Sequence, residues 1–193
     1  MTPTQTSTDT TATSTLPAAG VYNVDAVHST VGFIARHLVA SKVRGRFTDF
    51  TGSITVGDTL ETSSVEATVQ AASITTDNEM RDAHLKSPDF LEFETYPTLS
   101  FTSTKITAKG GEEFELVGDL TIKGITKSVT FDLEFLGSGP SMAPGVTVAG
   151  FEARTEIDRR DFGVTFQGNL ENGSLIVSNK IVLEFSIEAA QQA

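Results

Sequence analysis

The clearest evidence for the fold is the stretch FELVGDLTIKGITKSVTFDLEF, residues 114–135. Apolar and polar residues alternate on both sides of a central KGITK turn. A period of two is typical of β-strands with one buried face, because successive side chains point to opposite sides of a sheet. Two such runs separated by a short turn with glycine predict a β-hairpin. The residues expected to face inward are Phe114, Leu116, Leu120, Ile122, Val129, Phe131, Leu133 and Phe135.

The same alternation recurs along most of the chain. VEATVQAA (65–72) and KIVLEFSIE (180–188) repeat it, and turn sequences such as VGDT and ENGS separate the runs. Many evenly spaced strands predict an all-β domain, either a sandwich or a closed antiparallel barrel. An eight-stranded barrel is wide enough to be filled by side chains or to hold one slender ligand. The expected strands are residues 22–37, 43–56, 62–73, 97–108, 113–123, 127–137, 146–158 and 175–188.

Phe47 and Phe50 interrupt this pattern, because residues three apart on a regular strand face opposite sides. A β-bulge adds one residue to a strand and thereby reverses the facing of the residues after it. We therefore predict a bulge near Thr48–Asp49 that turns both rings inward.

Composition limits the function. The chain has 193 residues, enough for one domain, and its net charge of −11 argues against binding to nucleic acid and disfavours docking on anionic lipid. The absence of cysteine excludes disulfides, thiolate metal ligands and cysteine nucleophiles. Thirteen of the fifteen aromatic residues are Phe, whose rings need no hydrogen-bond partner. This excess of Phe favours a well-packed β core, and it is also compatible with an apolar cavity.

The N-terminal residues 1–20 are rich in Thr and Ser and are expected to form a disordered arm. They contain neither the basic region nor the apolar region of a secretory signal, and no stretch has the length of a membrane span. A cytoplasmic protein with one domain, residues 21–190, and no integral membrane segment is therefore expected.

One short helix is predicted at about 77–86, between the third and fourth strands. In TTDNEMRDAHLKSPDF (75–90), Thr76 and Glu79 fit a capping box, although Asp77 or Asn78 fits the cap position equally well. The Ser87–Pro88 pair ends the helix, because a residue before proline avoids helical geometry.

The sequence gives little support for a catalytic site or a metal site. His28 and His37 are an odd number of residues apart, so on one regular strand they face opposite sides, and no metal is expected. Asp82 and His84 point in different directions on a helix, so the acid does not orient the imidazole. No Gly-x-Ser-x-Gly sequence occurs, and no catalytic residue is predicted. Arg81 and His84 share a helix face, which suits either loop contacts or the polar mouth of an apolar interior.

Five segments are recognisable together: VDAVHSTVGFIARH (24–37), VRGRFTDFTGSI (43–54), SITTDNEMRDAHLKSPDFLEFETYPTLSF (73–101), VGDLTIKGITKSV (117–129) and DRRDFGV (158–164). In combination and order, the chain resembles the YceI-like family of lipocalin-like polyisoprenoid-binding proteins. The resemblance implies an eight-stranded antiparallel barrel around an elongated apolar channel for isoprenoid chains, such as quinone tails or polyprenyl lipids. Many members of that family carry a periplasmic signal, and this chain has its Thr/Ser arm instead.

The resemblance also suggests which residues contact the ligand. It implies an apolar channel lined by Phe33, Phe47, Phe101, Phe131, Leu133, Leu183 and Phe185. It implies a polar mouth formed by His37, Arg81, Asp82, His84 and, more weakly, Arg160.

The predicted function is non-catalytic carriage or sequestration of one long apolar lipid. No cofactor other than that ligand is expected, the partner is a small-molecule lipid, and a homodimer is compatible with the resemblance. Two alternatives stay open: an enzyme that acts on lipid with His84 as general base, and a filled barrel that serves as an interaction or stress module.

Overall fold

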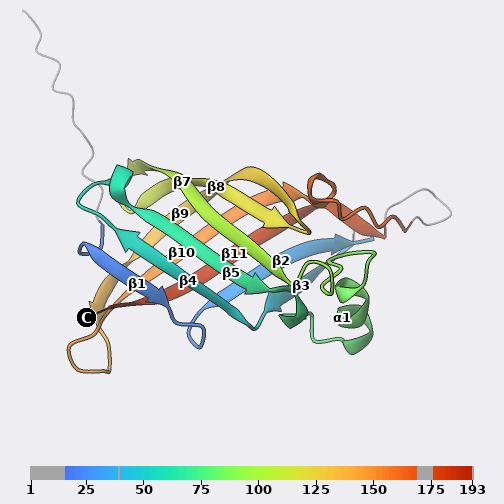
Figure 1. Ribbon diagram of the computed structural model, residues 1–193, viewed down its shortest axis with the longest axis horizontal. Coiled ribbons are helices and arrows are strands. Elements are labelled where there is room, and N and C mark those ends of the chain that lie inside the picture. Colours follow the sequence, from blue (N-terminus) through green and yellow to red (C-terminus); the bar gives the residue numbers. More distant parts are fainter. Residues whose placement is uncertain (1–15, 39, 169–175, 193) are drawn as a thin grey trace, which may run out of the picture.

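The chain forms one closed antiparallel β-barrel with a helix beside one end (Figure 1). The computed structural model describes residues 16–38, 40–168 and 176–192. Most of the arm predicted to be disordered therefore lies outside the described residues. Among the described residues, no helix has the length and apolar character needed to cross a membrane.

The sheet contains eleven strand segments. They are β1 (Gly20–Val24), β2 (Thr30–His37), β3 (Ser41–Phe47), β4 (Phe50–Val56), β5 (Ser64–Gln70), β6 (Ile74–Thr75), β7 (Thr98–Gly110), β8 (Glu113–Ile122), β9 (Ile125–Pro140), β10 (Thr147–Asp158) and β11 (Val177–Gln191). Three 3₁₀ turns, η1 (Leu60–Thr62), η2 (Ala71–Ser73) and η3 (Arg159–Phe162), and the helix α1 (Glu79–Lys86) complete the described elements.

Three of the barrel strands are interrupted once each. β1 continues into β2, β3 into β4, and β5 into β6, so the eleven segments form eight strands. The ring closes because one edge of β11 pairs with β10 and the other edge pairs with both β2 and β1. The prediction of an eight-stranded antiparallel barrel is confirmed.

The interruption between β3 and β4 falls at the predicted bulge. Thr48 and Asp49 leave the regular ladder and bond instead to the chain around η2, where Thr48 donates its N–H to Ser73 and Gln70 donates its N–H to Asp49. Phe47 and Phe50 both line the barrel interior as a result. The prediction that both rings turn inward is confirmed, and the irregularity that reverses the facing is a break between two strand segments.

The β8–β9 hairpin is joined by the two-residue turn Lys123–Gly124, with φ of 50° and 72°. Positive φ at both positions is the type I′ turn, whose twist matches that of the flanking strands. This turn fixes the register, so that Leu116 lies opposite Phe131 and both side chains are buried.

Helix α1 begins later than the capping-box prediction requires. Asn78 is the N-cap, and its side chain accepts from the N–H of Arg81. The Thr76–Glu79 capping box is therefore wrong, because Thr76 is committed to other partners, and Asn78 is the correct alternative. The predicted end at Ser87, before Pro88, is confirmed.

Candidate functional site

The barrel interior holds an apolar cavity. Its volume is about 180 Å³, and apolar atoms form nearly all of its wall. Strands from around the whole ring contribute to the lining, with Leu16, Pro17 and Leu60 adding to it from the end where β1 begins. An apolar, largely enclosed space without converging polar groups favours a hydrocarbon ligand.

Phe rings dominate the cavity wall. Phe131 lies between Phe101 and Phe185, with ring centroids 5.4 Å from each. Phe135 and Phe151 form a second pair at 5.4 Å. Such contacts hold the rings in defined positions, so the cavity is bounded by packed side chains.

The structure places six of the seven predicted channel residues in this wall: Phe47, Phe101, Phe131, Leu133, Leu183 and Phe185. Phe33 is not among the lining residues. Its ring packs against Phe47, with centroids 6.1 Å apart, and lies over Gly45, which has no side chain to exclude it. Four further rings line the cavity: Phe50, Phe114, Phe135 and Phe151. The first three are predicted to face inward, although they are not among the predicted channel residues.

The predicted polar-mouth residues of α1 are engaged in holding the helix. Asp82 accepts bonds from Thr75 and Thr76, and Arg81 donates to the hydroxyl (2.7 Å) and the carbonyl (3.1 Å) of Thr76. Burial acts to raise the pKa of Asp82, but the bonds from Thr76 and Thr75 outweigh it and lower that pKa. These contacts fix α1 to the end of β6.

His84 belongs to a separate cluster at the same end. Its Nε2 lies 2.9 Å from a carboxylate oxygen of Asp89. Its ring packs roughly perpendicular to the rings of Phe90 and Phe166, with centroids 5.0 Å from each. Helix α1 is thereby joined to the segment that follows η3. Sequence reasoning was right to separate Asp82 from His84 and did not select Asp89 as the acid.

The two remaining mouth candidates take part in neither of these two groups of contacts. His37 is the last residue of β2, and Arg160 forms an ion pair with Asp158 at 2.6 Å. The hydrogen bond from Arg160 holds the pKa of Asp158 at about 2. None of the five predicted mouth residues lines the cavity, and their contact with a head group stays a prediction.

Arg159, next to Arg160, is a buried cation that sequence reasoning did not select. Its side chain is 5% exposed and donates to the carbonyls of Val164 and Ser178 and to the side chain of Asn179. Burial lowers its pKa. These bonds tie the segment after η3 to the start of β11.

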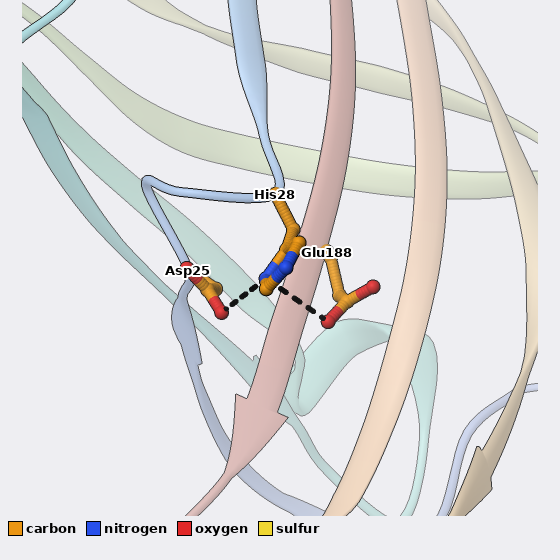
Figure 2. A group of neighbouring side chains, drawn as sticks. All are labelled: Asp25, His28 and Glu188. Carbon is orange, nitrogen blue, oxygen red and sulfur yellow. Dashed lines mark hydrogen bonds and ion pairs between the residues drawn. The ribbon is translucent and has the colours of Figure 1, made fainter. Parts of the chain in front are cut away.

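Asp25, His28 and Glu188 form a third polar group, at the break between β1 and β2 (Figure 2). His28 Nδ1 lies 2.8 Å from Asp25 and 3.8 Å from Glu188, and the three potential ligand atoms lie within 4.8 Å of one another. The turn is held to β11 by bonds from the Asp25 N–H and the Ser29 hydroxyl to the Glu188 carbonyl. All three side chains are substantially exposed. Asp25 and His28 are three residues apart in the sequence, so their contact is local. Glu188 reaches them only because β11 pairs with β1 when the barrel closes.

Comparisons with known proteins agree with this architecture. A family model described as a YceI-like domain matches residues 22–189. A UPF0312 protein of Staphylococcus aureus (strain N315) is 37% identical over 169 residues, which cover 86% of this chain and 95% of that protein.

Solved structures extend the similarity to three dimensions. The crystal structure of Burkholderia cenocepacia BcnA superposes with a TM-score of 0.74 at 24% identity, covering 86% of this chain and 98% of BcnA. A polyisoprenoid-binding domain from Saccharophagus degradans superposes with a TM-score of 0.64 at 16% identity, covering 91% and 100%. These two likenesses establish the barrel fold.

Proposed function

The chain belongs to the YceI-like domain family, and on that premise we propose that it binds one long apolar lipid chain inside its barrel without chemically changing it. Isoprenoid chains, as in quinones and polyprenyl lipids, are the proposed ligand class. One solved relative with the same fold is described as a polyisoprenoid-binding domain, which supports this class. A homodimer and a cytoplasmic location stay predictions of the sequence.

The Phe-lined cavity is the observation that carries the proposal. A filled barrel would leave no internal space, whereas this interior retains an apolar cavity that side chains from the whole ring enclose. Burial of hydrocarbon would supply the affinity at roughly 25 cal/mol per Å² of apolar surface removed from water.

The position of His84 supports binding over catalysis. The rival proposal uses His84 as a general base on bound lipid. His84 has an acidic partner in Asp89, but neither residue lines the cavity. Turnover lost in His84→Ala with lipid binding retained would favour the enzyme.

Lipid extraction from the purified chain, followed by mass spectrometry, tests the proposal directly. A stoichiometric isoprenoid or acyl species is expected, and loading of emptied protein with a quinone should restore it. A chain that is consistently empty and accepts neither quinone nor fatty amide would contradict lipid binding.

A cavity-filling variant localises the ligand. Ala67 lines the cavity, so Ala67→Phe should reduce lipid uptake. Thr68→Phe, on the opposite face of the same strand, is the matched control and should load normally. Circular dichroism confirms that both variants fold, and equal loading of the two would place the ligand outside the barrel.

A further inference from the structure

The β2–β3 hairpin is the basic part of an acidic protein. No Asp or Glu occurs between Asp25 and Asp49, although the whole chain has 25 acidic residues and 14 basic ones. The same interval contains four of the basic residues: Arg36, Lys42, Arg44 and Arg46.

The strand register places all four cations on the outer face. Arg36 lies opposite Lys42, while Arg44 and Arg46 lie opposite Ile34 and Gly32. Phe47, with the opposite parity, lines the interior. All four basic side chains are exposed. Within the described ranges, Arg46 has an acidic partner, Asp77 at 3.0 Å, and no ion pair involves the other three.

The hairpin is accessible along one edge as well as on its face. β3 pairs with β2 along its length, but with β6 only at Arg46 and Phe47. Figure 1 shows the end of β2 on the same side of the barrel as α1. Met80 of α1, at that end, is 85% exposed.

The opposite wall of the barrel carries a row of three glutamates. Glu134 of β9 lies directly between Glu113 of β8 and Glu152 of β10 in the register. In the closed ring, β9 is four strands away from β3 in both directions. The hairpin itself therefore differs in charge from the wall across the barrel, and the net charge of −11 does not describe it.

We propose that the outer face of β2–β3 docks on a bilayer that contains anionic phospholipid, with Arg36, Lys42 and Arg44 in the headgroup region. Basic residues next to an anionic leaflet are attracted to it, and the attraction acts within about one Debye length, roughly 8–10 Å. The row of Glu113, Glu134 and Glu152 faces away from the bilayer in this orientation.

A membrane suits this surface better than an acidic protein, because a row of cations on an exposed ribbon recognises charge without a shaped pocket. The choice rests on the proposed function, since a chain that carries a membrane lipid must meet the bilayer that holds it. Docking places the α1 end of the barrel near the source of the ligand.

Vesicle flotation with the full chain tests the proposal. Wild-type protein should float with phosphatidylcholine vesicles containing phosphatidylglycerol, and not with phosphatidylcholine alone. Binding should weaken as salt rises. The double variant Lys42→Glu/Arg44→Glu should reduce the apparent affinity at least about tenfold.

A matched variant separates position from net charge. Lys105→Glu/Lys127→Glu changes the charge equally, and both residues are exposed on β7 and β9. It should retain binding to within about threefold. Equal losses in the two variants, or no binding by the wild type, would overturn the proposal. Wild-type binding to polyglutamate but not to vesicles would overturn it in favour of an acidic protein partner.

The test is independent of the cavity. Charges on an exposed strand also prevent edge-to-edge association between protein molecules. A hairpin variant that aggregates but still binds vesicles normally would show that the cations serve this purpose, and would overturn docking. Emptied wild type and emptied hairpin variant, loaded with a quinone in solution without vesicles, should take up equal amounts, because the substituted residues lie outside the cavity wall. Docking by a consistently empty barrel would instead remove the proposed cargo and leave the docking surface established.

Discussion

The carboxylate of Asp82 accepts hydrogen bonds from both the main-chain N–H and the hydroxyl of Thr76, with the N–H bond at 2.8 Å. It also accepts from the hydroxyl of Thr75 at 2.8 Å. Since Thr75 ends β6 and Asp82 lies in α1, this one carboxylate joins the helix to the barrel.

Asp82→Ala should therefore loosen α1 from the barrel. Hydrogen bonds to a charged group contribute about 2 kcal/mol to stability, so the free energy of unfolding should fall by about that amount in urea titrations. Met80→Ala, on the exposed side of the same helix, should change it by less than about 0.5 kcal/mol. Equal stability of the two variants would show that the Asp82 contacts do not anchor the helix.

Gly118 on β8 should not tolerate a side chain. A Cβ there would lie 2.4 Å from Cζ of Phe101 and 2.6 Å from the carbonyl oxygen of Thr102. The main-chain oxygen cannot move aside, so Gly118→Ala should lower the free energy of unfolding by about 2 kcal/mol. Gly139→Ala on β9, where a Cβ meets nothing within 4 Å, is the control and should stay within about 0.5 kcal/mol of wild type.

Glu134 lies opposite like charges on both sides, Glu113 and Glu152. Like charges directly opposite on neighbouring strands destabilise a sheet, so Glu134→Gln should raise the free energy of unfolding by about 0.5 kcal/mol at low salt. The gain should shrink as salt is added. Glu156→Gln, which removes the partner of Lys180, should give no gain. Denaturant unfolding of both variants at two salt concentrations measures the difference.

The Asp25–His28 pair should make stability depend on pH. The hydrogen bond with Asp25 raises the pKa of His28, and the bond from His28 lowers the pKa of Asp25. The His28 contribution is complete below its ordinary pKa of 6.5 and disappears as pH rises through the raised value. The Asp25 contribution is present above its ordinary pKa of 3.8 and disappears as pH falls through the lowered value.

Thermal unfolding of wild type and His28→Gln across pH measures this contribution. The Tm of the wild type should exceed that of His28→Gln most near about pH 6, and the difference should be smaller at about pH 9. Groups common to both proteins cancel in the difference. A difference that is constant over this range would show that the pair does not contribute to folding.

Alternation along the chain was sufficient to predict the eight strands, because each run records locally which face is buried. The irregularity at Thr48–Asp49 followed from the parity of Phe47 and Phe50, and the end of α1 from Ser87–Pro88. The helix cap stayed open in the sequence because Thr76, Asp77 and Asn78 are all suitable caps. The contacts of Thr76 with Asp82 and Arg81 exclude it and leave Asn78 as the cap.

The site was less predictable. The parity of a residue along a strand predicts whether its side chain points into the barrel, but not whether that side chain reaches the cavity. Phe33 and Phe47 therefore look equivalent in the sequence, although only Phe47 lines the cavity. The partners Asp89 and Glu188 also escaped prediction. His84 is completed by an acid beyond the end of its helix, and Asp25–His28 by a residue from the last strand.

The sequence by itself determined the strand pattern, the hairpin turn and the inward Phe residues, because these depend on residues within a few positions of one another. Closure of the ring decided the rest. It placed β11 beside both β1 and β2, enclosed the apolar cavity, and put the acid-free β2–β3 hairpin opposite the glutamates of β8, β9 and β10. Those relationships join residues far apart in the chain, so neither local sequence patterns nor overall composition reveals them.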